Sequence, residues 1–152
     1  GVEVFEKDNK AVIENGTVKF VYDLSSGRYD AIDMRDNSVC IKDGYFQLND
    51  LTSTMPGLES TYKTRKISDE LGKGKTLSIQ CVKPGEITLL FEVSLYDQKN
   101  CIVFRSGIEN TTSEKVRLKV IKPLAKGIIF NGFKMQKNFR MIDGNSGEEP
   151  LV

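Results

Sequence analysis

The segment Ile87–Tyr96, with the sequence ITLLFEVSLY, carries an apolar side chain at every second position. Successive side chains of an extended chain point to opposite faces, so these apolar side chains would all share one face. A strand with one apolar face has to bury that face against a second layer of the protein. The segment therefore predicts a strand in a sheet that is buried on one side. The apolar members are Ile87, Leu89, Phe91, Val93 and Leu95.

The same alternation recurs along the chain, and turn-forming residues separate the runs. Roughly ten short strands with a turn signal about every 8 to 12 residues are typical of an all-β sandwich. We therefore predict one domain over residues 1–152 that consists of an antiparallel two-sheet β-sandwich. No window of a dozen residues has a helical period, and a single turn at ISDEL, Ile67–Leu71, is the most helix that we expect. The other alternating runs are Val18–Tyr22, Leu77–Cys81, Ile102–Ile108 and Lys115–Val120.

Two segments lack the alternation. Residues 49–60, NDLTSTMPGLES, predict a surface excursion between two strands, and a functional or mobile loop of this length is the alternative. The tail Gly144–Val152 reads as a connection that no strand follows. It predicts that the chain is a piece of a larger sandwich or of a longer multidomain protein.

The composition excludes several kinds of chemistry. The chain has no histidine, which removes the usual general base and the commonest zinc ligand, and its three cysteines form no CxxC pair. A carboxylate pair, a lysine Schiff base or no catalysis at all remain, and we expect no cofactor and no metal. With 22 Lys and Arg against 21 Asp and Glu, and no apolar run long enough to span a membrane, neither nucleic acid nor membrane is an expected partner. The N-terminus lacks the pattern of a secretion signal, so a secreted and a cytoplasmic location both stay open.

The stretch Leu71–Ile79, LGKGKTLSI, resembles a phosphate-binding loop only at first sight. Such loops work because their glycines lead into a helix N-terminus, whereas here they lead into an alternating strand. We interpret the stretch as a tight corner before a core strand, with Lys73 and Lys75 in solvent.

Other candidate sites have ordinary structural explanations. Lys115, Arg117 and Lys119 could meet phosphates or an acidic polysaccharide, but without interleaved aromatic residues a solvated sheet face is the better interpretation. The string DGNSGEE, Asp143–Glu149, has the oxygen ligands of a calcium loop but no closing bidentate glutamate. Sequons begin at Asn15 and Asn110, where turns also call for such residues.

A carbohydrate site usually combines an aromatic platform with carboxylate, amide or arginine groups. The chain has no tryptophan, but Tyr29, Tyr45 and Tyr62 lie near turns. We select Tyr45, and Tyr62 together with Arg65 beside the long loop, as candidate carbohydrate-binding residues. The alternative is that these tyrosines lie at sheet margins with solvated hydroxyl groups.

The order of the motifs resembles a known domain. VYDLSSGRYDAIDM, DELGKGKTLSI, the long run from Leu89 to Leu124 and NFRMIDGNSGEEP follow one another as in the N-terminal β-sandwich domain of family 36-type α-galactosidases and the related raffinose-synthase group. The resemblance implies a supersandwich-like fold that packs on a catalytic (β/α)₈ barrel, shapes one wall of the sugar pocket and joins subunits. The catalytic carboxylates of that family belong to the barrel, so the resemblance implies no catalytic residue in this chain. The matching residues are Gly72, Gly74, Leu95, Tyr96, Asp97, Asn110, Thr111 and Pro123.

Three functions follow as hypotheses. The first is a non-catalytic accessory domain of an α-galactosidase-like glycoside hydrolase, with the barrel of the same polypeptide, a galactoside and further subunits as partners. The second is an independent carbohydrate-binding module. The third is a small glycosidase that uses two of its own acids, for example Asp143 with Glu148, although nothing in the sequence would raise the pKa of either one.

Overall fold

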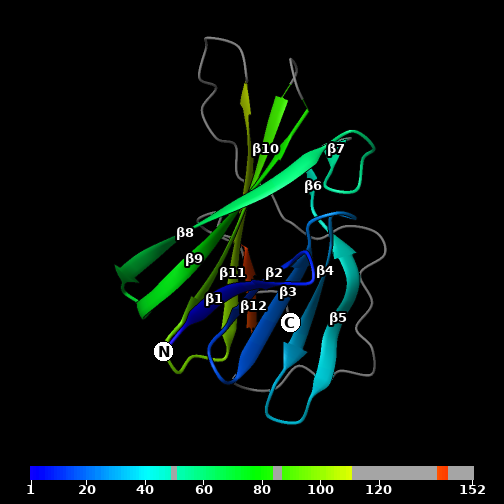
Figure 1. Ribbon diagram of the computed structural model, residues 1–152. Helices are drawn as coiled ribbons and strands as arrows, with labels where there is room; N and C mark the ends of the chain where they lie inside the picture. Colours follow the sequence, from blue (N-terminus) through cyan, green and yellow to red (C-terminus); the bar gives the residue numbers. More distant parts are fainter. Residues whose placement is uncertain (49–50, 84–86, 111–139, 144–152) are drawn as a thin grey trace.

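The computed structural model describes residues 1–48, 51–83, 87–110 and 140–143, and these residues form two facing sheets (Figure 1). The first sheet is an antiparallel meander in which each strand pairs with the next along the chain. Its strands are β1 (Glu3–Lys7), β2 (Lys10–Glu14), β3 (Val18–Asp23), β4 (Arg28–Asp33) and β5 (Ser38–Tyr45). The described part of the chain contains no helix, and hence none that could cross a membrane.

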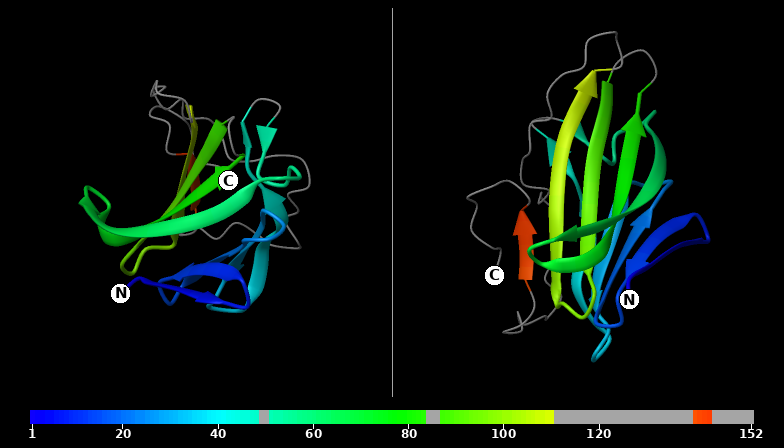
Figure 2. Two further views of the ribbon diagram at one scale, coloured as in Figure 1. Left: turned by 45° about the horizontal axis from the view of Figure 1, so that its top comes forward. Right: turned by 90° about the vertical axis from the view of Figure 1, so that its left-hand side faces the viewer.

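The second sheet has the order β12-β11-β10-β9-β8. Its pairs are antiparallel except for β12, which lies parallel to β11. Figure 2 shows the strong curvature of β8 at one edge of this sheet. The strands are β8 (Glu59–Asp69), β9 (Gly72–Val82), β10 (Ile87–Tyr96), β11 (Cys101–Asn110) and β12 (Arg140–Asp143), and a separate small ribbon pairs β6 (Gln47–Leu48) with β7 (Leu51–Thr52).

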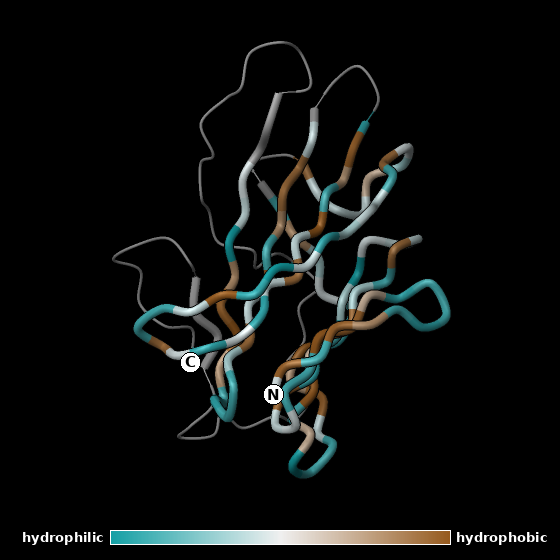
Figure 3. The backbone as a smooth tube through the Cα atoms, turned by 60° about the vertical axis from the view of Figure 1, so that its left-hand side comes forward, coloured by the Kyte–Doolittle hydropathy of each residue, from teal (hydrophilic) through white to brown (hydrophobic). Residues whose placement is uncertain are grey.

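The two-sheet β-sandwich predicted from the sequence is confirmed. The strand registers place the alternating apolar residues in rows that face the other sheet, such as Leu77, Val93 and Phe104 across β9, β10 and β11. The facing row of the first sheet holds Ile13, Phe20 and Ala31. All six side chains are fully buried in one core cluster. Figure 3 shows apolar positions, in brown, along the strands of both sheets.

Phe46, in the segment that leaves β5, lies between the two sheets. Its ring stacks on Phe91 of β10 at 4.4 Å between centroids and contacts Tyr29 of β4 at 4.7 Å. Aromatic pairs of this kind contribute about 0.5–1.5 kcal/mol each beyond the apolar area that they bury. An aromatic contact between the layers therefore comes from a residue outside the regular strands.

The segment that includes residues 51–60 holds Phe46 in place. The Ser53 hydroxyl accepts a hydrogen bond from the Phe46 N–H at 3.0 Å and donates one to the Gly27 carbonyl at 2.6 Å. Ser53 is buried, and its backbone carbonyl lies so close to Gly27 that a Cβ there would stand 1.8 Å away. The described part of the expected surface excursion thus has a structural role, while Asn49 and Asp50 lie outside the described residues.

Two further expectations from the sequence concern Ile67–Leu71 and Lys115–Val120. At Ile67–Leu71, where a single turn is the most helix expected, the chain forms no helix: β8 continues to Asp69, and a two-residue turn at Glu70 and Leu71 closes the hairpin with β9. The spacing of polar residues in ISDEL is compatible with a helical turn and with an extended strand, and the pairing with β9 selects the strand. The strand expected at Lys115–Val120 lies outside the described residues.

A corner precedes the core strand β9, as the sequence predicts, and the two glycines of LGKGKTLSI lie in the first residues of that strand for different reasons. Gly72 has a positive φ of 115° and no neighbour near the position of a Cβ. Gly74 pairs with Tyr96 of β10, and a Cβ there would meet the Leu95 carbonyl oxygen at 2.0 Å. The first glycine is required by the backbone conformation and the second by the close approach of two strands.

Substitution of these two glycines should therefore have unequal effects. Gly74→Ala has to push β9 away from β10 and should destabilise the fold by about 2–4 kcal/mol. Gly72→Ala meets only the strain of a positive φ and should cost about 1 kcal/mol. Urea unfolding followed by circular dichroism measures both, and equal losses would contradict the packing explanation.

Asn15, in the turn between β2 and β3, joins this turn to the second sheet. Its amide nitrogen donates to the carbonyls of Tyr96 at 2.7 Å and Lys99 at 2.8 Å. Its oxygen accepts from the N–H groups of Thr17 and Val18 and from the Thr17 hydroxyl. With 8% of its surface exposed, Asn15 has its amide nitrogen engaged inside the protein. The first sequon therefore offers no free acceptor nitrogen in the folded state, whereas the second sequon extends outside the described residues.

Asn15→Ala should destabilise the protein by about 2–3 kcal/mol, because it removes five hydrogen bonds, two of which join the turn to the second sheet. The exposed Asn37 provides a control: Asn37→Gly keeps its positive φ of 59° without strain and should change stability by less than about 0.5 kcal/mol. Chemical unfolding of both variants checks this, and a loss for Asn15→Ala no larger than the control's would show that the bridge is dispensable.

Candidate functional site

Tyr62 lies on β8 with its ring directed toward the core. The ring packs against the buried cluster, and the hydroxyl group bonds to Glu6 of β1. Partial burial, and then the carboxylate of Glu6, raise the pKa of Tyr62. The ring thus joins the edges of the two sheets and does not present an open, flat platform.

Arg65 lies three residues further along β8 and therefore on the opposite face of the strand. Its guanidinium group donates to both carboxylate oxygens of Glu92 on β10, at 2.6 and 3.2 Å. This ion pair raises the pKa of Arg65. The structure therefore does not bring Tyr62 and Arg65 together, and no described contact connects either of them with Tyr45.

Tyr45 lies at the end of β5, directly opposite Arg28 of β4. The Arg28 guanidinium carbon stands 5.3 Å from the centre of the Tyr45 ring, and its Nη1 donates to the Asp43 carbonyl at 2.9 Å. Tyr45 is half-buried. Of the three residues selected from the sequence, only Tyr45 contacts a residue, Arg28, that lines a polar hollow of the described surface.

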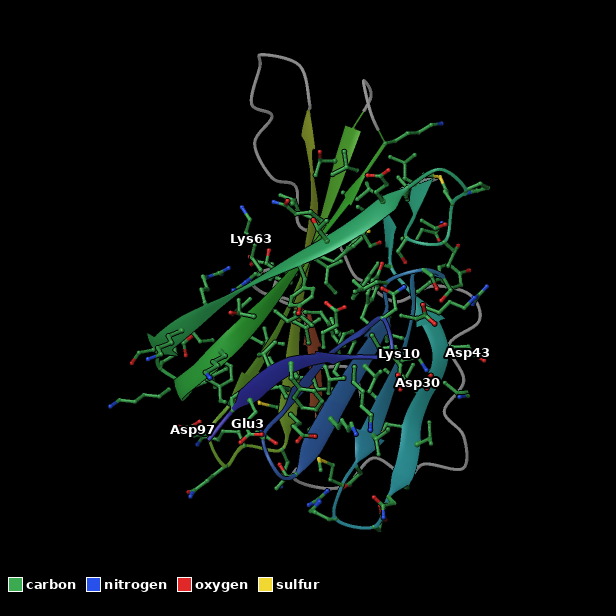
Figure 4. The ribbon with its side chains drawn as sticks, viewed as in Figure 1. Glu3, Lys10, Asp30, Asp43, Lys63 and Asp97 are labelled. Carbon is green, nitrogen blue, oxygen red and sulfur yellow. The ribbon has the colours of Figure 1, made fainter. Side chains whose placement is uncertain are left out.

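This hollow, named here the mixed-charge hollow, lies on the outer face of the first sheet above Val21. It has a volume of about 130 Å³. Figure 4 shows Lys10, Asp30 and Asp43 near one another at this place (Figure 4). Its charged lining residues are Lys10, Asp23, Arg28, Asp30, Lys42 and Asp43.

A β-bulge between β4 and β5 forms one wall of the mixed-charge hollow. Two residues of β5, Lys42 and Asp43, face the single residue Asp30 of β4. The Asp30 carboxylate accepts the Asp43 N–H at 2.9 Å and the Lys42 ammonium at 3.3 Å, and Asp43 has a positive φ of 52°. Bulges redirect side chains in this way. The alternation of apolar residues in the sequence does not predict this bulge.

Asp23 forms the opposite wall, where the chain turns from β3 into β4. Its carboxylate accepts the Ser25 hydroxyl at 2.6 Å and the N–H groups of Ser25 and Ser26 at 2.9 and 3.1 Å. The Ser25 hydroxyl is the main reason why the pKa of Asp23 is lowered. Asp23 is therefore held as an anion and suits the role of a hydrogen-bond acceptor.

The mixed-charge hollow brings three cationic and three anionic side chains together, and Arg28 of its lining contacts the ring of Tyr45. That arrangement can bind a neutral molecule with several hydroxyl groups, because each hydroxyl can donate to one group and accept from another. Its volume is below the 300 to 1,000 Å³ that is common for enclosed ligand sites. Only a small group, bound in a shallow and weak manner, fits this geometry.

The described residues include no group of three or more Cys, Asp or Glu that could hold a metal ion. Burial raises the pKa of the Cys40 thiol to about 12, and burial also raises that of Cys81, which lies among Tyr22 and Ser60 between the sheets. Neither thiol is therefore activated as a nucleophile. The lysine and arginine stripe at residues 115–119, Glu148 and the rest of the calcium-like string lie outside the described residues, and for Asp143 only the backbone, at the end of β12, is described.

Comparison of the chain with protein-family models, with curated proteins and with solved structures found no match in any of the three. The resemblance to the N-terminal domain of family 36-type α-galactosidases thus stays a prediction from the motif order. The carbohydrate-binding roles of Tyr45, Tyr62 and Arg65 likewise stay predictions.

The pKa of Asp23 tests whether the Ser25 hydroxyl holds this carboxylate as an anion. Ser25→Ala should raise it toward the ordinary value of about 3.9, because the hydroxyl donor is lost. Because the folded-state pKa of Asp23 is lowered, its contribution to stability is present above the unfolded pKa and is lost as the pH falls through the folded pKa. Carbon-13 NMR titration of the carboxyl group measures the pKa, and Ser26→Ala, which keeps the N–H donor, should leave it unchanged.

Proposed function

We propose that the chain is a non-catalytic β-sandwich domain of an α-galactosidase-like glycoside hydrolase, and that it contributes a weak carbohydrate-binding surface beside the catalytic barrel of the same polypeptide. The order of the sequence motifs supports the family, and the mixed-charge hollow beside Tyr45 supports the binding role. This hollow is the single observation on which the binding role rests, because three cationic and three anionic side chains converge in it and Arg28 of its lining contacts the Tyr45 ring.

The electrostatics of the described acids agree with a non-catalytic role. A glycosidase requires one carboxyl group with a raised pKa to act as the acid. The shifts resolved for the described aspartates, at Asp23, Asp33 and Asp36, are all downward, and hydrogen-bond donors nearby are the first cause of each. These groups are suited to accept hydrogen bonds and to order turns.

The outer face of the first sheet also offers a surface for a neighbouring domain. Phe5 of β1 is the one large apolar side chain among the described residues that is clearly exposed, at 37%. It forms a row with Val12 and Val21, and Val21 underlies the mixed-charge hollow. A barrel that covers Phe5 would stand beside the hollow, so the hollow would border on the barrel's substrate.

An independent carbohydrate-binding module is the second candidate. The same hollow would then bind sugar without a neighbouring domain. The coding sequence beyond residue 152 distinguishes the two candidates, because a barrel with aspartates at its strand ends is expected only for the first.

Binding is tested by NMR titration of the isolated chain with galactose and raffinose. We expect saturable shifts in β4 and β5 around Tyr45 with a dissociation constant in the millimolar range, because the hollow is shallow. Tyr45→Ala should remove at least about 1 kcal/mol of binding, which is roughly a fivefold loss of affinity. Lys63→Gln on the second sheet is the matched control and should bind like the parent chain.

Two outcomes would refute the proposal. Shifts that are absent throughout the millimolar range, or that are the same in Tyr45→Ala, would remove the binding role. Turnover of a nitrophenyl galactoside by the purified chain would show that it is catalytic after all.

A further inference from the structure

A second hollow lies at the other end of the sandwich, where the β8–β9 hairpin passes the N-terminal residues Gly1 and Val2. It has a volume of about 550 Å³, within the range of ordinary ligand sites. Three lysines line it, Lys66 of β8 together with Lys73 and Lys75 of β9, and Asp97 is the one carboxylate in its lining. We call it the lysine hollow.

The register places two of these cations directly opposite each other. Lys66 pairs with Lys75 across the hairpin, so their Cβ atoms stand about 5 Å apart. Like charges at such a distance destabilise a sheet. Lys73, two residues before Lys75, adds a third positive charge on the same face of β9.

No ion pair in the described part of the chain involves these three lysines. The ion pairs there join Arg35 with Asp33, Lys42 with Asp30 and Arg65 with Glu92, and the three lysines take part in none of them. Arg65 on the same strand shows the contrast, because its charge is matched by both oxygens of Glu92. Asp97 can balance at most one of the three lysines.

Backbone contacts fix the position of the strands that carry the three lysines. The Asp97 N–H donates to the Lys73 carbonyl at 2.8 Å, which ties the end of β10 to the hairpin. Gly74, between Lys73 and Lys75, lets β9 approach Leu95 more closely than a residue with a Cβ could. The three ammonium groups are therefore carried by a strand pair whose position is fixed.

We propose that the lysine hollow binds an oxyanion, a phosphate or sulfate group, and that this group is either a free anion or a substituent of a sugar. Such an anion lying between Lys66 and Lys75 replaces their mutual repulsion with two charge-assisted hydrogen bonds. The Ser68 hydroxyl, also in the lining, is a further donor. This site lies on a different sheet from the mixed-charge hollow and does not depend on the proposed function.

The test is a titration of the chain with sodium phosphate and with sodium sulfate at constant ionic strength, followed by NMR of the lysine side chains. We expect saturable shifts at Lys66 and Lys75. The double variant Lys66→Gln, Lys75→Gln should bind at least roughly tenfold more weakly, since each lost charge-assisted bond is worth about 1.5 kcal/mol or more. This variant should stay folded, because it removes a repulsion.

Lys63→Gln is the matched control. Lys63 also lies on β8, but three residues from Lys66 and so on the other face of the strand, away from the region of Asp97 in Figure 4. It should bind phosphate within twofold of the parent chain. General stabilisation by sulfate affects all variants equally and does not saturate, so it does not mimic site binding.

Two further titrations separate the sources of the anion. A sulfated oligosaccharide that binds more tightly than free sulfate, while its unsulfated form does not bind, identifies a sugar substituent. Equal affinity of free and sugar-borne sulfate identifies the free anion. Absence of saturable shifts at Lys66 and Lys75, or equal affinity in the double variant and the parent chain, would overturn the proposal.

Discussion

The contact of Phe46 with both sheets is the interaction on which the rest of the structure depends. Two sheets with apolar inner faces can slide over one another unless their side chains interlock. The Phe46 ring, stacked on Phe91 and close to Tyr29, fixes their relative position. Because Phe46 belongs to the segment after β5, the chain makes this contact just before it enters the second layer.

Polar groups secure the same arrangement at two places. Ser53 bonds to Phe46 and Gly27, while Asn15 connects the turn after β2 with the carbonyls after β10. Buried polar groups favour one arrangement only when their bonding capacity is filled, and the Asn15 amide uses both its nitrogen and its oxygen. Features that resemble a surface loop and a glycosylation signal in the sequence therefore act as internal connections.

The charged residues fall into two groups: those whose charge is balanced by an ion pair and those whose charge is not. Glu92 satisfies Arg65, and Asp33, buried at the end of β4, holds Arg35 through two bonds. The mixed-charge hollow has donors and acceptors in equal number, which suits a neutral polyhydroxy ligand. The lysine hollow has an excess of positive charge, which suits an anion. The two sites therefore differ in the chemistry that they can recognise.

The sequence by itself determined the strands, their inward faces and the corner at Gly72 and Gly74, because a period of two and the stereochemistry of glycine are local properties of the chain. It also held a signal that the tyrosine and arginine hypothesis missed: residues 62 and 65 of one strand have to face opposite ways. Only the tertiary structure decided the partner of Asn15, 81 residues away, as well as the bulge opposite Asp30 and the two hollows. Contacts of that kind depend on how separate strands align, and the pattern within any one strand carries no information about that alignment.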